Sequence, residues 1–348
     1  MSLSTEPDAP AVSPTGAATF AEVPQVSTPG RIALRRVRSS KGAIVAFVVL
    51  LIVVLTSLGA PLYAHQIAHT SEYANHLSDS IRIDGKETNV VSYAGIPIGP
   101  TYGSKFFLGA DGNGRDVMVR LLYAGRTSLF IGVVATFISI LIGSIFGMLA
   151  GFYRGWVDTV ISRILDLLWA FPVILLGVAL GVATATDGLN IWFIHIHSGS
   201  LWLPSLIIGV VNVVYIARPT RGIVLSLRER AFVEAAVSQD ASGTKILRRE
   251  IFPNLVTSFL VLAPIVISQT VALEAALSFL GAGVQPPQAS WGTMISDGLD
   301  KIISAPHLTI VPSLVLVATI LSLNIIGDVV REALDPRGTL RAAEGDKR

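Results

Sequence analysis

The 348-residue sequence contains no cysteine, and only 14% of its residues are Asp, Glu, Lys or Arg. The absence of cysteine excludes a disulfide framework, a thiolate metal site and a thiol nucleophile. Charged residues make up about a quarter of an ordinary soluble chain, whereas 51% of this chain is hydrophobic and its mean hydropathy is +0.64. The composition therefore predicts a protein that crosses a membrane several times.

Motifs for nucleotide chemistry are also missing. The sequence has no Gly-x-x-x-x-Gly-Lys-Ser/Thr loop, and Gly243-Thr244-Lys245 lacks both the upstream glycine and the following hydroxyl. Gly112-Asn113-Gly114 follows no strand pattern, so it is not a dinucleotide loop. The basic residues flank apolar runs and form no stripe, which argues against nucleic acid as a partner. We therefore predict no cofactor, and any ATP hydrolysis must belong to another subunit.

The histidines give no sign of a metal centre. His195 and His197 stand two apart, and His65, His69 and His76 fall in one polar segment. Histidines two apart without nearby carboxylates, such as His195 and His197, are interpreted as polar groups at the membrane interface. No catalytic residue and no metal site is predicted.

Six apolar runs are long enough to cross a hydrocarbon core, which takes about 20 residues. They are bracketed by Lys and Arg, most of which fall on one side if the N-terminus is cytoplasmic. This bias places both termini in the cytosol. The predicted spans are residues 43–63, 127–151, 159–183, 201–221, 251–280 and 308–330.

The segments outside the spans divide the chain further. Residues 1–40 are rich in Pro, Ser, Thr and Ala and predict a disordered cytoplasmic tail. A first transmembrane helix at 41–64 leads into an external loop at 65–126. Its polar stretch, residues 64–110, has too few apolar residues for a core of its own. Residues 111–126 predict an amphipathic helix at the membrane interface. Val117, Met118, Leu121 and Leu122 share its apolar side, and Arg115, Asp116 and Arg120 lie away from it. The core domain is residues 127–338, with a cytoplasmic loop at 222–250, and a short tail follows at 339–348.

Two further patterns concern the spans. Gly143, Gly147 and Gly151 repeat at the four-residue spacing that lets helix backbones approach closely. Asp166 and Glu274 lie inside apolar runs, where acids are functional suspects. Arg163 stands three residues before Asp166, which favours a structural ion pair. Glu274 lies near the outer end of its span and is our candidate for the transport pathway.

The loop at 222–250 has the pattern of a docking element. Leu225 to Val237 predicts a helix, Gln239 to Ala241 breaks it, and Ser242 is placed to cap a second helix that continues through Lys245 to Glu250. Because an ordinary connecting loop needs no such pair of helices, we expect a soluble partner to bind here.

Val233-Glu234-Ala235-Ala236 followed by Ile251-Phe252-Pro253-Asn254 resembles the EAA loop in permease subunits of the dipeptide, oligopeptide and nickel ABC importers. Asp240 stands where that family usually has Gly, and Asp tolerates the left-handed backbone such a turn needs. Similar signatures occur at Leu108 to Leu129, at Leu277 to Gly292, and at Asn324 to Asp328 with Asp335-Pro336-Arg337. Ala110 and Phe252 replace the usual Thr and Leu.

The resemblance implies an all-α polytopic membrane protein with six transmembrane helices and the type I ABC importer permease fold, in the inner (plasma) membrane of a prokaryote. It implies a homologous second permease, two ABC ATPase subunits, an external solute-binding protein and surrounding membrane lipid as partners. The residues expected to contact the ATPase are Glu234, Ala235, Ala236 and Asp240, flanked by Arg228 and Arg230.

Substrate and driving force leave alternatives open. Short peptides are the expected substrate of such a permease, and nickel chelates and oligosaccharides are alternatives. A different class of protein, a proton-coupled secondary transporter, would use Asp166 or Glu274 as its relay and would need no soluble partner. Such transporters commonly carry an internal repeat, which we do not detect.

Overall fold

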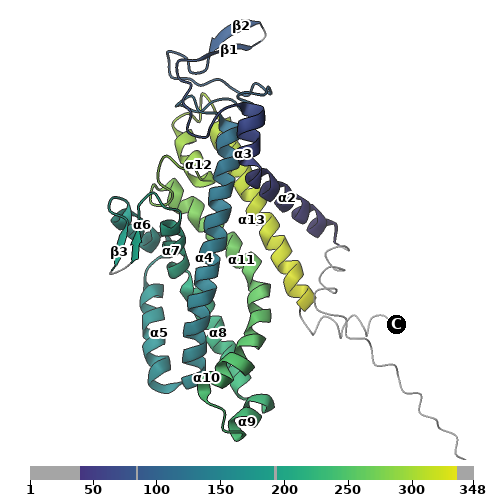
Figure 1. Cartoon of the computed structure of the whole chain (residues 1–348), viewed down its shortest axis with the longest axis vertical. Helices are drawn as coiled ribbons and strands as arrows, with labels where there is room; N and C mark the ends of the chain where they lie inside the picture. The colour runs from purple at the N-terminus through teal and green to yellow at the C-terminus, as the bar shows by residue number, and fades with distance from the viewer. Residues whose placement is uncertain (1–39, 84, 192–193, 335–348) are drawn as a thin grey trace, which may run out of the picture.

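The computed structural model describes residues 40–83, 85–191 and 194–334. The predicted tails at 1–40 and 339–348 lie outside this range, apart from Ser40, as does the Asp335-Pro336-Arg337 signature. The protein is an elongated helical bundle with a helical hairpin at one end (Figure 1). At the other end lies an irregular segment, residues 69–116, which we call the external segment after its predicted location. Its principal helices are α2 (Lys41–Leu58), α4 (Val117–Tyr153), α5 (Gly155–Ala170), α6 (Val173–Thr184), α7 (Trp202–Val211), α8 (Val213–Arg228), α11 (Phe252–Phe279) and α13 (His307–Leu334).

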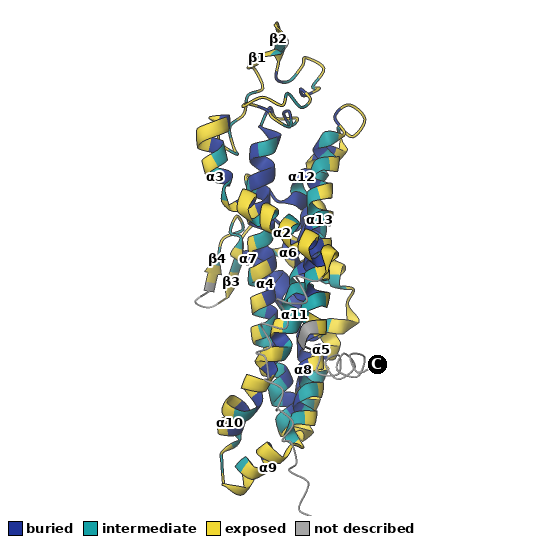
Figure 2. Ribbon diagram, turned by 90° about the vertical axis from the view of Figure 1, so that its right-hand side faces the viewer, coloured by how far each residue is buried: buried dark blue, intermediate teal, exposed yellow. Residues whose placement is uncertain are grey.

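The central helix is α4, which packs against α8, α11, α7 and α2. Its contact with α8 depends on small residues, as predicted. A Cβ atom at Gly143 would lie 2.7 Å from the Cβ of Ile216, and one at Gly147 would lie 2.6 Å from the Ala217 carbonyl oxygen. The glycines therefore let the backbone and side chains of α8 pack directly on the α4 backbone. The buried residues gather along these inner helices (Figure 2).

The predicted six spans correspond to four long helices and two bent pairs. The continuous spans are Lys41–Leu58, Val117–Tyr153, Gly243–Phe279 and His307–Glu332. The third combines a short helix α10 (Gly243–Ile246), a π-helical turn η2 (Leu247–Ile251) and α11. The predicted boundary at residue 251 is therefore no helix end, and one 37-residue element runs from the hairpin through the bundle.

The predicted span at 159–183 is not one straight helix. Helices α5 and α6 meet at an angle of 87° across Phe171-Pro172. Proline lacks a backbone N–H and pushes the preceding residue out of the helical region, and Phe171 is extended, with φ −95° and ψ 137°. Helices α7 and α8 are bent more gently, by 44°, at Asn212.

The separate interfacial helix predicted at 111–126 is also wrong. The Asp116 side chain accepts hydrogen bonds from the N–H groups of Met118 and Val119 and so caps α4, which then runs unbroken from Val117 to Tyr153. Nor does Arg120 lie away from the apolar side, because it is 4% exposed.

The external segment has a small core, contrary to the prediction. Its antiparallel strands β1 (Ser80–Ile83) and β2 (Lys86–Asn89) pair Ile81 with Thr88. Ile81 and Ile83 cover a buried cluster of Val90, Ile98, Phe106 and Ala110. These apolar residues are scattered over some 30 positions without a helix or strand period, which is why the sequence pattern did not reveal them. Short helices α3 (Ala60–Tyr63) and η1 (Ala64–Ala68) connect α2 to this segment, and a second hairpin, β3 (Leu189–Ile191) with β4 (Ile194–Ile196), follows α6.

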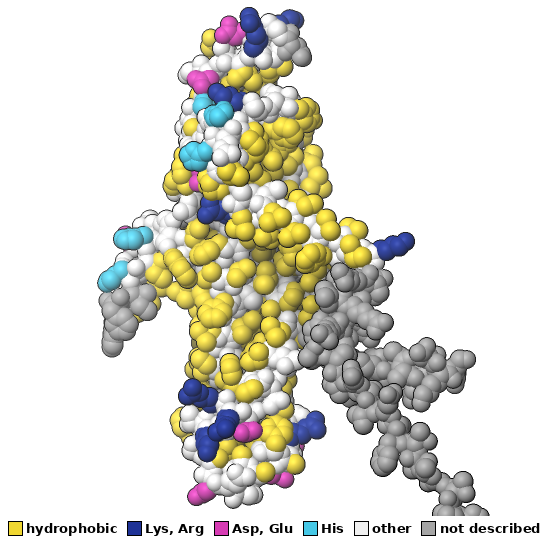
Figure 3. Space-filling view, turned by 45° about the vertical axis from the view of Figure 1, so that its right-hand side comes forward, with side chains coloured by type: hydrophobic (Ala, Val, Ile, Leu, Met, Phe, Trp, Pro, Cys, Tyr) yellow, Lys and Arg dark blue, Asp and Glu magenta, His cyan; other side chains and the backbone are white. Residues whose placement is uncertain are grey.

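Apolar side chains dominate the middle of the molecular surface, and Lys and Arg lie mostly toward its two ends (Figure 3). Many large hydrophobic side chains are exposed, including Phe47 at 52%, Phe137 at 65% and Trp156 at 77%. Such an apolar belt between charged ends is the surface expected of a protein surrounded by lipid and by other membrane subunits.

Candidate functional site: a helical hairpin at one end of the bundle

The predicted docking loop forms a helical hairpin that extends beyond the bundle at one end (Figure 1). Helix α8 ends at Arg228, and a separate helix α9 (Ala231–Ser238) follows, so the predicted single helix from Leu225 to Val237 is interrupted at Glu229-Arg230. The chain then turns at Asp240 and enters α10. We call residues 229–250 the coupling hairpin.

The turn at Asp240 has the predicted left-handed backbone, with φ +59°. The Asp240 N–H donates to the Val237 carbonyl, and the Ala241 N–H donates to the Ala236 carbonyl. This pair of hydrogen bonds is the Schellman motif, in which the left-handed position usually holds Gly. Ser242 occupies the cap position of α10, as predicted, although its side chain makes no capping hydrogen bond.

The predicted contact residues lie on the outer surface of the coupling hairpin. Glu234, Ala235 and Asp240 are exposed, and Ala236 is half-buried. Val233, one position earlier, is 2% exposed and fastens α9 to a core cluster that includes Ile246 and Ile251. The hairpin is thus anchored on one side and presents its Glu-Ala surface on the other.

A groove of about 550 Å³ runs beside Glu234. Phe152 and Tyr153, at the end of α4, line one wall, and Val233, Val237 and Ser238 of α9 line the other. Neither aromatic residue was expected at the site from the sequence. The sequence does place both residues just before the Arg154-Gly155 turn, and this turn puts the end of α4 on the same side of the membrane as the hairpin.

Arg228 and Arg230 differ in their surroundings. The Arg228 guanidinium donates to the Phe152 carbonyl oxygen at 2.7 Å and lies 5.8 Å from the Phe152 ring centroid. It thereby caps the end of α4 and lines the groove, and its predicted contact with a partner stays a prediction. Arg230 is exposed at the start of α9.

Ion pairs join α5 to α8 close to this end of the bundle. Arg221 binds Asp158 with two hydrogen bonds of 2.6 Å. Arg218 pairs with Asp166 at 2.8 Å and lies 4.5 Å from the Trp169 ring centroid. The predicted pairing of Asp166 with Arg163 is wrong, since the tertiary contact with α8 supplies the partner. Asp166 nevertheless has the structural role that was expected.

Glu274 is fully buried, with 0% exposure. The Ser278 hydroxyl donates to its Oε1 at 2.7 Å, and the Ser128 and Ser290 side chains face the same carboxyl. The side chain therefore presents no surface to a pathway in this structure. Its position instead joins three segments, α4, α11 and the loop before α12 (Trp291–Leu299).

Four charged residues cluster where the external segment meets α4 and α12. Arg115 Nε pairs with Asp111 at 2.7 Å. Buried Arg120 lies 3.4 Å from both Asp111 and Asp297. Nearby, burial raises the pKa of the Asp116 carboxyl, although three backbone N–H groups oppose the shift. The carboxylates of Asp111 and Asp297 balance the charges of Arg115 and Arg120, which explains how Arg120 can be buried.

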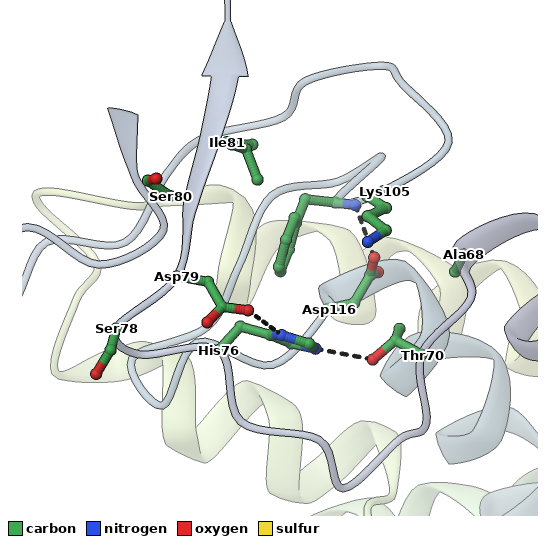
Figure 4. A pocket seen from close by; sticks show the side chains of 10 residues that line it. Ala68, Thr70, His76, Ser78, Asp79, Ser80, Ile81, Lys105 and Asp116 are labelled. Atoms are coloured by element: carbon green, nitrogen blue, oxygen red, sulfur yellow. Dashed lines mark hydrogen bonds and ion pairs between the residues drawn. The ribbon is translucent and has the colours of Figure 1, made fainter. Parts of the chain in front are cut away.

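A separate pocket of about 380 Å³ in the external segment contains His76 (Figure 4). Its ring nitrogens bond Thr70 at 2.9 Å and Asp79 at 2.7 Å. His195 bonds Asn190, far from these residues in the fold. Among the residues that the structure describes, no group of three or more His, Asp or Glu side chains is arranged to hold a metal ion.

Two protein families match this chain. The family described as "Binding-protein-dependent transport system inner membrane component" matches residues 143–339, and the "N-terminal TM domain of oligopeptide transport permease C" matches residues 28–78. The chain is a binding-protein-dependent transport permease. The match over 143–339 includes the coupling hairpin and α11, and the match over 28–78 includes α2.

Relatives of this permease carry related names. It is 36% identical over 249 residues to the glutathione transport system permease protein GsiD of Pectobacterium atrosepticum, covering 72% of this chain and 78% of that one. It is 33% identical over 310 residues to the dipeptide transport system permease protein DppC of Alkalihalophilus pseudofirmus, covering 89% and 90%. The oligopeptide transport system permease protein OppC of Haemophilus influenzae is 36% identical over 239 residues, covering 68% and 72%.

A solved structure confirms the fold. An inward-facing conformation of the MetNI methionine ABC transporter aligns with a TM-score of 0.50 at 20% identity, covering 63% of this permease and 98% of the matched chain. The predicted type I ABC importer fold and the function of a membrane-embedded permease subunit are therefore confirmed. This assignment excludes the alternative of a proton-coupled secondary transporter.

Proposed function

We propose that this permease forms half of a translocation pore, beside a homologous second permease, and that each permease docks one of two ABC ATPase subunits. The exposed apolar belt supports the first part, because apolar helix faces can pack against a second permease as well as against lipid. The absence of a nucleotide-binding loop in the sequence supports the second, since ATP must then bind to another chain.

The observation that carries the docking proposal is the coupling hairpin itself. It is anchored through Val233, while Glu234 and Ala235 remain exposed beside a groove of about 550 Å³. Small side chains at Ala235 and Ala236 let a partner approach the backbone of α9 closely. A carboxylate at Glu234 can accept hydrogen bonds from that partner or pair with one of its cations.

We propose short peptides as the substrate class, delivered by an external solute-binding protein that meets the outer surface, including the insert at 64–106. The relatives named for glutathione, dipeptides and oligopeptides support this choice. Nickel chelates and oligosaccharides are the competing classes to test. In this proposal both termini face the cytosol.

Charge reversal at the hairpin tests the docking proposal. In reconstituted complexes, Glu234→Lys should lower transport and ligand-stimulated ATP hydrolysis by about tenfold or more, because it replaces an acceptor with a repelling cation at the centre of the contact. Membrane insertion should be unchanged. The matched control is Asp187→Lys, an exposed charge reversal in the loop after α6. Normal coupling in Glu234→Lys would refute the assignment of this surface.

The substrate class is tested by hydrolysis measurements on the same complexes. The cognate binding protein is loaded in turn with dipeptides, glutathione, nickel chelates or oligosaccharides, and stimulation of ATP hydrolysis is recorded. We expect stimulation by the peptide ligands. Stimulation by a nickel chelate or an oligosaccharide alone would overturn the proposed substrate class while leaving the coupling role intact.

A further inference from the structure

The external segment at 281–299, which includes α12, is held against the bundle by unusually close contacts. A Cβ atom at Gly292 would lie 2.3 Å from the Ala275 carbonyl oxygen, and one at Gly283 would lie 2.3 Å from the Ser278 hydroxyl oxygen. Trp291 between them is 1% exposed. The backbone of the segment therefore rests directly on α11.

Three serine hydroxyls each accept a backbone N–H of this segment. Val284 N donates to Ser278 at 3.0 Å, Trp291 N donates to Ser128 at 3.2 Å, and Thr293 N donates to Ser290 at 3.2 Å. Ser128 belongs to α4 and Ser278 to α11, while Ser290 caps α12. The three serines thus hold the beginning of the segment and the first turn of α12.

Glu274 lies at the centre of these serines. A hydroxyl whose oxygen already accepts an N–H still has its own proton to donate. Ser278 donates its proton to Glu274 Oε1 at 2.7 Å. Ser128 and Ser290 face the same carboxyl, whose Oε2 accepts no direct hydrogen bond within the described part of the chain. One buried carboxyl therefore orients the Ser278 hydroxyl directly and is the common neighbour of the other two hydroxyls.

The helix that carries Glu274 also reaches the coupling hairpin. The element from Gly243 to Phe279 is continuous, so its first turns belong to the hairpin and its last turns carry Glu274 and Ser278. At its other end α12 is tied to α4 through Asp297, which lies 3.4 Å from Arg120. A displacement of the hairpin can therefore be transmitted along one helix to the segment at 281–299.

We propose that Glu274 is a positioning residue for transport, because it fastens the external segment at 281–299 to α11 and α4 so that the three move as one body. This inference rests on the proposed coupling function of the hairpin. Glu274 touches no substrate in this account, and it acts through the serines and the backbone they hold.

The test uses the full complex and a spin label at Ile303→Cys. The chain has no native cysteine, and Ile303 is 95% exposed just beyond α12. In Glu274→Gln an amide N–H₂, which cannot accept a proton from a serine hydroxyl, replaces one of the two carboxyl oxygens. We expect greater mobility of the label and about a tenfold fall in the ratio of ligand-stimulated to basal ATP hydrolysis. Glu274→Asp, which keeps the carboxyl group, should restore part of both.

Two further variants complete the design. Ser205→Ala is the matched control, because Ser205 is fully buried and its hydroxyl donates only within its own helix, to Leu201 O at 2.7 Å. It should match the wild type in both measurements. Ser128→Ala removes one fastening hydroxyl and leaves the carboxyl in place, so it should change both readouts in the same direction but less, even if Glu274→Gln assembles poorly.

Wild-type label mobility together with wild-type stimulation in Glu274→Gln would overturn the proposal. So would increased mobility without any loss of stimulation, since the fastening would then be irrelevant to transport. If the wild-type complex itself shows no stimulation by a binding protein, the proposed function fails. The label mobility of the purified subunit then still decides whether Glu274 holds the segment.

Discussion

At the scale of single residues, Asp240 shows how local backbone geometry selects a side chain. Its left-handed φ of +59° closes the turn between α9 and α10. For a non-glycine residue this conformation costs about 1 kcal/mol, and Asp is among the residues that tolerate it best.

Substitutions at Asp240 should therefore move stability in opposite directions. We expect Asp240→Gly to raise the free energy of unfolding by up to about 1 kcal/mol, because glycine adopts positive φ without strain. Asp240→Val should lower it, because a β-branched side chain is strained there. The measurement is the unfolding midpoint of the purified complex in detergent. Equal midpoints for all three proteins would contradict the role assigned to this turn.

Arg228 and Asp166 make a complementary point about charged side chains. Both were identified from the sequence, but their partners are a carbonyl at the end of α4 and an arginine on α8. Those partners lie 76 and 52 residues away along the chain. Local spacing could suggest only Arg163 for Asp166, because a helix neighbour is the sole partner that spacing reveals.

At the scale of elements, the α4–α8 contact depends on the absence of side chains. A Cβ atom at Gly147 would lie 2.6 Å from both the Ala217 carbonyl oxygen and the Thr220 Cβ. We expect Gly147→Ala to lower the free energy of unfolding by about 1–3 kcal/mol through overpacking, measured as thermal unfolding in detergent.

The matched control for that substitution is Gly222→Ala on α8. Nothing lies within 4 Å of a Cβ atom at Gly222, and Ala is the better helix former by about 1 kcal/mol. Its stability should be equal to or above that of the wild type. If both variants lost stability equally, close approach at Gly147 would not be the reason for its glycine.

The spacing of these glycines along α4 was visible in the sequence, and so was the coupling hairpin. The break between α5 and α6 was visible in principle, because Pro172 marks it. It was missed because the apolar run continues through the break, and hydropathy alone cannot distinguish a straight span from one bent by 87°.

At the scale of the whole molecule, the distribution of charge predicts which end faces the cytosol. The cysteine-free chain permits a direct test with single cysteines and a membrane-impermeant maleimide. We expect Ile303→Cys, 95% exposed, to react in intact cells. Gln239→Cys on the exposed coupling hairpin should react only after the membrane is opened. The opposite pattern would reverse the proposed orientation.

The sequence by itself determined the membrane location, the order of the spans, the hairpin and the family, because hydrophobic length, charge placement and short motifs are local properties of the chain. Only the tertiary structure decided what surrounds Glu274 and Arg120. Both side chains are buried, and polar partners reach them from distant segments, Ser128 and Ser290 for Glu274 and Asp297 for Arg120. A buried polar group is stable only with such partners, and packing alone brings them together.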